Sequence, residues 1–277
     1  GVTIVAMGTS LPELATSLFA VLEGLQSWNS WLLVVPVDAI IGSNIANVLI
    51  VIGLASIWAR SIKVTNKLIE SDIPLLCMFT GVFVIFLYTD RVITRPEAYV
   101  SLLLFIVFLS YSIVTRSKHI FFTGHRPTFS HRDIAILVWA FFGVLIGGQL
   151  AVRSLSGIIE SFGLEQFGVL TLVLLAVSTS LPEVIVSVQA ARKRKFQIAI
   201  GNIFGSSVFN MLFVWWIAGA IVPLPVSQQA YTIGIPFLIL SALAFVFAGQ
   251  DDHIGRWEGI GFLSIYMVFI LMIAGVV

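Results

Sequence analysis

Two glutamates, Glu13 and Glu183, lie inside long apolar stretches and share the same neighbours. Glu13 ends the motif Gly8-Thr9-Ser10-Leu11-Pro12-Glu13, and Glu183 ends Ser178-Thr179-Ser180-Leu181-Pro182-Glu183, 170 positions later. A carboxylate at membrane depth costs about 2.5–3.5 kcal/mol on insertion scales, and such residues usually mark ion or substrate sites. One glutamate alone could serve as a structural hydrogen-bonding group between helices. Two in matching contexts favour a functional site built from both.

Hydroxyl groups accompany each carboxylate at helical spacing. Thr9 and Ser10 precede Glu13 by four and three residues, so one helix face presents both hydroxyls and the carboxylate. The second copy repeats the arrangement with Thr179, Ser180 and Glu183. An isolated serine in a membrane helix often bonds only to its own backbone. The repeated spacing favours an oxygen-rich site instead.

Prolines and a second pair of motifs add further oxygens. Pro12 and Pro182 have no N–H, so the carbonyl groups four residues earlier lose their helical donors. A motif similar to Gly42-Ser43-Asn44-Ile45-Ala46-Asn47 recurs 163 positions later, as Gly205-Ser206-Ser207-Val208-Phe209-Asn210. Each copy places a serine and an asparagine four residues apart on one helix face. The leading glycine permits close helix contact.

These candidate ligands are all oxygen atoms, because neither motif contains histidine or cysteine. Oxygen ligands suit hard cations such as Ca2+ and Na+ and do not suit zinc or copper. Two carboxylates neutralise one Ca2+, two Na+ or two protons. A site that holds either load, but not both at once, meets the requirement for antiport. No cofactor is expected beside the transported ions.

The composition is that of a helical membrane protein. Of 277 residues, 58% are hydrophobic and 10% are charged, against about 25% charged in soluble domains, and the mean hydropathy is +1.05. The net charge of +1 gives no indication of nucleic acid as a partner, so the expected partners are small cations and the lipid bilayer. Apolar runs of about 20 residues predict membrane spans. Nine such spans lie near 2–23, 33–58, 71–89, 96–115, 133–156, 168–191, 196–220, 230–248 and 257–277.

Basic residues predict the orientation of these spans. The loops after the second, fourth, sixth and eighth spans hold 12 of the 15 Lys and Arg residues, and the other loops hold 3. The richer side is expected to be cytoplasmic. The first span then runs outward and the sixth inward, so the two glutamate motifs are antiparallel, as in an inverted-topology repeat. We expect a first half over 1–115, a cytoplasmic basic linker over 116–132 and a second half over 133–277.

The sequence resembles the cation/calcium exchanger superfamily at the two glutamate motifs, at Gly42–Asn47 and at Gly201-Asn202-Ile203-Phe204-Gly205-Ser206. The expected spans and the basic middle loop extend the resemblance over the whole chain. That superfamily has ten helices in two inverted halves of five. The resemblance therefore implies an all-α polytopic membrane protein with two inverted-topology repeats. It also implies that this sequence begins after the first helix of the family.

The resemblance implies roles for the motif residues. Glu13 and Glu183 would be shared by Ca2+ and the counter-ion, and two threonines would join them at the calcium position. Serine and asparagine side chains and two backbone carbonyls would complete flanking sodium positions. The implied metal ligands are Glu13, Glu183, Thr9, Thr179, Ser10, Ser180, Ser43, Ser206, Asn47, Asn210, Ala6 and Ala176. The helix that contains Gly147, Gly148 and Gln149 would be one of two gating helices.

The sequence departs from the family pattern in three ways. Asn210 stands where sodium-driven relatives often have aspartate, which leaves two carboxylates in the site and leaves the driving ion open. Asp38-Ala39 replaces the usual Gly-Asn before Gly42, and Ser178 replaces a glycine. Because Asp38 is near the outer end of its span, we interpret it as an interfacial residue and not as a ligand.

The sequence thus predicts a secondary antiporter, not an enzyme, that exchanges Ca2+ for Na+ at a midplane site by alternating access. The expected location is the plasma membrane, or the inner membrane if the source is bacterial. A proton- or potassium-coupled calcium exchanger is the alternative within the same family. A cation channel with the glutamates as a selectivity ring is a different class. An intramembrane hydrolase is disfavoured, because no His or Lys base lies at membrane depth. One chain suffices to form the site, and the sequence does not fix the oligomeric state.

Overall fold

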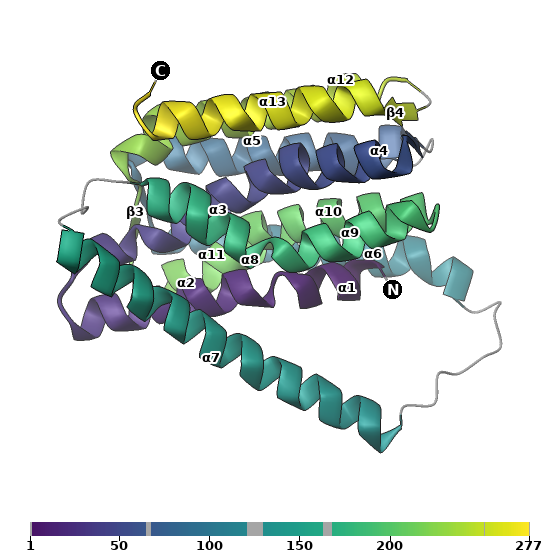
Figure 1. The fold of residues 1–277 in the computed structure, drawn as a ribbon. Coiled ribbons are helices and arrows are strands. Elements are labelled where there is room, and N and C mark those ends of the chain that lie inside the picture. The colour runs from purple at the N-terminus through teal and green to yellow at the C-terminus, as the bar shows by residue number, and fades with distance from the viewer. Residues whose placement is uncertain (1, 65–67, 121–129, 163–167, 252, 277) are drawn as a thin grey trace.

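The computed structural model describes the chain except for residues 1, 65–67, 121–129, 163–167, 252 and 277, and it is built almost entirely from helices (Figure 1). The first part of the chain contains α1 (Val2–Thr9), α2 (Leu11–Gln26), η1 (Ser30–Leu33), α3 (Val35–Ala46), η2 (Asn47–Ile52), α4 (Gly53–Ala59), β1 (Ser61–Lys63), η3 (Leu68–Asp72), α5 (Ile73–Asp90), β2 (Val92–Ile93) and α6 (Arg95–Ile120). The second part contains α7 (His131–Phe162), η4 (Val169–Leu175), α8 (Ala176–Thr179), α9 (Leu181–Arg192), α10 (Phe196–Phe209), η5 (Asn210–Val214), α11 (Trp215–Ile221), β3 (Leu224–Pro225), η6 (Ala230–Gly234), α12 (Ile235–Ala248), β4 (His253–Gly255) and α13 (Arg256–Ile273).

Long apolar helices confirm a membrane-spanning protein. Seven helices of the described part of the chain meet the length and hydropathy of a membrane span: Ser30–Ala59, Ile69–Asp90, Arg95–Val114, His131–Ser161, Phe196–Ile221, Ala230–Ala248 and Arg256–Ile273. Thr171–Thr179 and Leu181–Arg192 form an eighth if the pair, bent by 52°, is one span. The first expected span, 2–23, is divided between α1 and α2 and is not in this set. The count of nine spans therefore stays a prediction.

The order of elements recurs along the chain. The series α3–η2–α4–β1–η3–α5–β2–α6 has the same types in the same order as α10–η5–α11–β3–η6–α12–β4–α13. Asn47 and Asn210 each begin a π-helical segment, η2 and η5. In Figure 1, α1 and α2 run from right to left, whereas α8 and α9 run from left to right. The orientation of the two halves in a membrane stays a prediction.

Two short antiparallel ladders, absent from the all-helical expectation, join the two parts of the chain. β1 pairs with β4, with Ser61 opposite Gly255, and β2 pairs with β3, with Val92 opposite Pro225. The labels of β3 and β4 lie at opposite ends of the bundle in Figure 1. Strands of two or three residues are too short to produce the alternating pattern that identifies a strand in a sequence.

The helices differ greatly in burial although their hydropathies are similar. The best apolar windows of Ser30–Ala59 and Phe196–Ile221, which contain α3 and α10, are 83% and 89% buried, whereas that of His131–Ser161 is 6% buried. α7 contacts α2 with its C-terminal part, and its N-terminal part extends away from the bundle (Figure 1). Membrane helices can be apolar on every side, because the lipid-facing side is apolar too, so hydropathy alone does not separate the centre of the bundle from its edge.

Glycines allow the closest helix contacts, as the sequence predicts. A Cβ atom on Gly42 of α3 would lie 2.0 Å from the Leu172 carbonyl oxygen of η4. A Cβ atom on Gly205 of α10 would lie 2.6 Å from the Ala6 Cβ of α1. These two glycines therefore seat the central helices α3 and α10 directly against the segments that carry the glutamate motifs.

The expected linker 116–132 is partly helical. α6 continues to Ile120 and α7 begins at His131, while 121–129 lies outside the described residues. The helix continues past the apolar run because residues 116–120 contain neither proline nor glycine to end it.

Candidate cation site

Each glutamate motif is a helix interrupted at a serine. Ser10 separates α1 from α2 and Ser180 separates α8 from α9, with φ and ψ of −89° and 10° at Ser10 and −82° and 2° at Ser180. The proline two residues later lies at the start of the next helix, where its missing N–H is tolerated. The break leaves a carbonyl without a helical donor and directs a serine and a glutamate side chain toward the centre of the bundle.

The two glutamates are buried, and each accepts a hydrogen bond from the serine of the other motif. Glu13 is 1% exposed and Glu183 is 0% exposed. Ser10 Oγ donates to Glu183 Oε1 at 2.9 Å, and Ser180 Oγ donates to Glu13 Oε1 at 3.2 Å. The structure therefore brings the two motifs, 170 positions apart in the sequence, into one site.

Ser43 of α3 and Asn210 of η5 extend the site beside Glu13. Ser43 Oγ lies 3.1 Å from Glu13 Oε1 and 2.8 Å from Ser180 Oγ. Asn210 Nδ2 donates to Ser43 Oγ at 3.2 Å. Glu13 comes from α2, Ser43 from α3 and Asn210 from η5, and Ser180 lies at the break between α8 and α9. The site therefore depends on packing between both parts of the chain.

A second cluster forms around Thr9 of α1. Its hydroxyl lies 3.1 Å from the Ala6 carbonyl, 3.2 Å from Ser206 Oγ and 3.4 Å from Asn202 Oδ1. Ser206 Oγ also donates to the Ala6 carbonyl at 3.3 Å. The expected ligands Ala6, Thr9 and Ser206 are therefore neighbours, although they come from α1 and α10.

Three expected ligands have fewer contacts with the rest of the site. The Thr179 hydroxyl bonds to backbone carbonyls of its own helix, at 3.1 Å to Ala176 and 3.2 Å to Leu175. Asn47 is fully buried at the start of η2, yet neither its Oδ1 nor its Nδ2 has a hydrogen-bond partner among the described residues. Thr179 also interacts with the Glu13 carboxylate. Ala176 and Asn47 belong to the helices that form the site but make no side-chain hydrogen bond to either glutamate among the described residues.

Several buried oxygens of the site lack partners in the described part of the chain. These atoms are Glu13 Oε2, Glu183 Oε2, Asn47 Oδ1 and Asn210 Oδ1. Burying such groups without a partner is costly, and the cost is largest for a charge. Carboxylate and amide oxygens are ligands of Ca2+ and Na+, so a bound hard cation would satisfy the group as a whole.

Two further buried polar residues are close to this site: Asn202 contacts Thr9, and Asp38 lies outside the site, five residues before Ser43 in α3. Asn202 also donates from Nδ2 to Ser187 Oγ at 3.1 Å. Its place in the motif Gly201–Ser206 was the available signal. Asp38 was interpreted as interfacial, and that interpretation is wrong: it is 1% exposed and accepts a hydrogen bond from Thr171 Oγ1 at 3.0 Å. η4 covers the first turn of α3, where Asp38 lies. A hydropathy profile does not reveal this contact.

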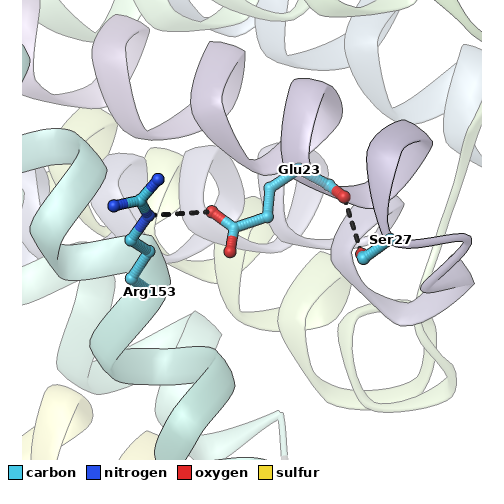
Figure 2. A network of polar contacts seen from close by, with 3 residues as sticks. All are labelled: Glu23, Ser27 and Arg153. Carbon is cyan, nitrogen blue, oxygen red and sulfur yellow. Dashed lines mark hydrogen bonds and ion pairs between the residues drawn. The ribbon is translucent and has the colours of Figure 1, made fainter.

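The outer surface of α2 carries a polar contact with α7. Figure 2 shows Arg153 of α7 reaching toward Glu23 of α2, with Arg153 Nε 4.0 Å from Glu23 Oε2, while Ser27 Oγ donates to the Glu23 carbonyl at 2.6 Å. These residues line a cavity of about 340 Å³ together with Gln149. Deeper along the same interface, a Cβ atom on Gly148 would lie 2.8 Å from Ala15 Cβ, whereas Gly147 has open space. α7 therefore contacts α2 closely through Gly148 alone of this glycine pair.

Comparison with known proteins fits this oxygen-lined site. The family model described as sodium/calcium exchanger protein matches residues 1–114 and 133–275. The chain belongs to the sodium/calcium exchanger protein family. It is therefore a transporter of the cation exchange class and not an enzyme, and the resemblance found in the sequence is confirmed.

Individual relatives of this exchanger cover nearly its whole length. It is 26% identical to the sodium/calcium exchanger MaX1 of Methanosarcina acetivorans, over 99% of this chain and 87% of that protein. It is 33% identical to the protein CaxA of Alkalimonas amylolytica, over 94% of this chain and 82% of that one. A solved structure of the sodium-calcium exchanger NCX_Mj has the same fold, with a TM-score of 0.67 and 24% identity over 97% of this chain and 84% of that one.

Proposed function

We propose that this family member is an antiporter that uses the Na+ gradient to move Ca2+, with Glu13 and Glu183 shared by both ions. The observation that carries the proposal is the reciprocal pair of serine–glutamate bonds. Each carboxylate uses Oε1 to accept from the opposite motif, and its Oε2 has no partner among the described residues. Two carboxylate oxygens are thus left for a cation that lies between the halves of the protein.

The charge of the site fits alternative loads. Two ionised glutamates balance one Ca2+ or two Na+, and a further Na+ would leave a net positive charge that is costly in a membrane interior. Neutral oxygens from serine, threonine and asparagine surround the pair. They can replace water around Na+, whereas proton binding by the two carboxylates alone would have less need of them.

Alternating access requires part of the protein to move while the site stays intact. We assign this movement to α7, because its apolar window is only 6% buried, whereas those containing α3 and α10 are more than 80% buried. α7 packs against α2, the helix that carries Glu13, so a movement of α7 would change the surroundings of that carboxylate. The two halves would have opposite orientations in the membrane, with the linker on the cytoplasmic side.

The driving ion is tested by calcium uptake into vesicles that contain the purified full-length protein. Gradients of Na+, K+ and H+ are imposed one at a time, with pH clamped in the first two cases. We expect uptake to follow the Na+ gradient and to saturate with Na+. A response to the pH gradient alone would assign the protein to proton-coupled exchange, which the amide at Asn210 leaves as the alternative. Calcium flux without any counter-ion would indicate a channel.

A further inference from the structure

A third buried carboxylate lies outside the Glu13–Glu183 site. The buried acidic residues of the described chain are Glu13, Glu183 and Asp38. Asp38 lies in the first turn of α3, five residues before Ser43. Five residues of helix correspond to about 7.5 Å along the axis. Asp38 is therefore close to the central site but is separate from it, at the end of α3 predicted to face the outside.

Packing fixes the surroundings of Asp38. The close approach of Gly42 to the Leu172 carbonyl brings η4 against α3, and one turn earlier it places Thr171 beside Asp38. Thr171 Oγ1 lies 3.0 Å from Asp38 Oδ2 and 3.2 Å from the Gly168 carbonyl. Ser227, from the segment before η6, also faces the carboxylate. The buried Thr171 hydroxyl thus lies between the Asp38 carboxylate and the Gly168 carbonyl.

One oxygen of this carboxylate accepts no hydrogen bond, although the side chain and the backbone of Ser227 both interact with the carboxylate. Asp38 Oδ1 is buried and has no hydrogen-bond partner among the described residues. A purely structural aspartate that tied α3 to η4 would be expected to use both oxygens, because an unsatisfied buried carboxylate oxygen costs free energy. The N-terminal turn of α3 favours a negative charge at Asp38 but supplies it with no counter-charge of a full unit.

We propose that Asp38, Thr171 and the Gly168 carbonyl form a separate subsite for a monovalent cation, with Na+ as the ion that fits the proposed function. One carboxylate balances one monovalent charge, whereas a divalent ion would be left with an excess positive charge in a buried place. Oxygen ligands of this kind suit Na+. The subsite supplies the negative charge that Asn210 does not, so a third Na+ is carried without net charge accumulating beside Glu13 and Glu183.

The segment beside Asp38 reaches the surface of the protein. Ser227 is half-buried, and the next residue, Gln228, is exposed. Asp38 lies behind them, followed along α3 by Ser43, which contacts Glu13. A cation that enters at this end would meet Asp38 before it meets the central pair.

The test measures binding of ²²Na+ to the purified full-length protein, so it needs no transport. In a Glu13→Gln, Glu183→Gln background the central charges are absent, and we expect one saturable Na+ site per chain to remain. Adding Asp38→Asn keeps an oxygen that can accept from Thr171 but removes the charge. It should weaken the remaining binding by on the order of tenfold or more, as loss of a buried paired charge does.

Thr171 provides a second variant and a matched control. Thr171→Val removes a ligand oxygen and should weaken Na+ binding, whereas Thr171→Ser keeps the hydroxyl and should preserve it. Absence of Na+ binding in the Glu13→Gln, Glu183→Gln protein, or binding that Asp38→Asn leaves unchanged, would overturn the subsite. Na+-driven calcium uptake by the unmodified protein is measured in parallel. It tests the proposed function separately, because failure of uptake leaves the binding result intact.

Discussion

The two central helices, α3 and α10, carry the same residue types at the candidate cation site and different ones a turn earlier in each helix. Both present a serine and an asparagine four residues apart, and both approach a glutamate motif through a glycine. Before that glycine, α10 has Gly201-Asn202, where Asn202 bonds to Ser187 and contacts Thr9. At the equivalent positions α3 has Asp38-Ala39, where the charge contacts Thr171 and the alanine is packed among apolar side chains. The residues that the two copies share belong to the candidate cation site. The residues that differ give α3 one additional charge, at Asp38.

The largest effect is expected where the copies agree. Glu13→Gln and Glu183→Gln should each abolish calcium exchange, because either change leaves a single carboxylate for a divalent ion. The folded protein should remain in the membrane, since Gln keeps an oxygen that can accept the serine bond. Calcium uptake by vesicles, normalised to the amount of monodisperse protein, measures this. Near-normal exchange in either variant would contradict a site shared equally by the two halves.

Side-selective labelling tests the predicted orientation of the second half in the membrane. A cysteine at Lys193, after α9, should react only from the cytoplasmic side, and a cysteine at Gln228, before η6, only from outside. The reason is the excess of Lys and Arg in the loops on the Lys193 side. A membrane-impermeant thiol reagent on intact cells, compared with opened cells, gives the answer. The free Cys77 requires a Cys77→Ser control background. Reversed labelling would overturn the predicted orientation of the second half, with the Lys193 loop on the cytoplasmic side.

Glycine substitutions compare how tightly α3 packs against η4 and how tightly α10 packs against α1. Gly42→Ala should lower the stability of the protein by about 1–3 kcal/mol, the usual cost of overpacking. The new methyl group would lie 2.0 Å from a backbone oxygen, which cannot move alone. Gly205→Ala should cost less, because its new contact is the Ala6 side chain at 2.6 Å on the short helix α1. Thermal unfolding in detergent measures both, with Gly147→Ala as a control in open space. Equal losses would show that the copies are packed alike.

A carboxylate introduced at position 210 tests how the charge of the site affects the driving ion. Asn210→Asp should leave Na+-driven calcium exchange working and make it more dependent on pH. The added carboxylate helps to balance Na+ only when ionised, so exchange should increase as the pH is raised and decrease as the carboxyl group takes up a proton. The assay is Na+-driven calcium uptake at a series of clamped pH values. A pH profile identical to that of the unmodified protein would show that position 210 does not face the ions.

The smallest effect is expected at the contact between α2 and α7. Glu23→Gln removes the charge that faces Arg153 but keeps the backbone carbonyl that accepts from Ser27. Ion pairs that are partly exposed contribute about 0.2–1 kcal/mol, so stability should change little, and the change should shrink at high salt. Thermal unfolding at low and high salt measures it. A large loss of stability would show that this contact, and not Gly148, holds α7 in place.

Much of the site could be predicted from the sequence because it depends on local spacing repeated twice. The separation of Ser10 from Glu13 places both on one helix face, and the second copy shows that the arrangement is not accidental. The spacing could not show that Ser10 bonds to Glu183 and not to its own glutamate, since that depends on how α2 and α9 cross. Asp38 was misinterpreted for a related reason. Its position near the end of a span indicates an interface, and only the packing of η4 on α3 reveals that it is buried.

The fold was predictable to the same degree. Apolar length identifies membrane helices, and the breaks at Ser10 and Ser180 follow from the prolines. The short strands and the difference in burial between α7 and α10 are tertiary features. Neither leaves a pattern in hydropathy, because lipid and protein interior are equally apolar surroundings.

The two β ladders have a mechanical consequence. They connect the halves at opposite ends of the bundle, so the halves form a frame closed at both ends (Figure 1). A rocking motion of one half against the other would open one ladder, whereas displacement of α7 leaves both unbroken. If α7 is the moving element, as proposed, its largely exposed surface would be surrounded mainly by acyl chains. The rate of exchange should therefore respond to the thickness and fluidity of the bilayer more than to changes inside the frame.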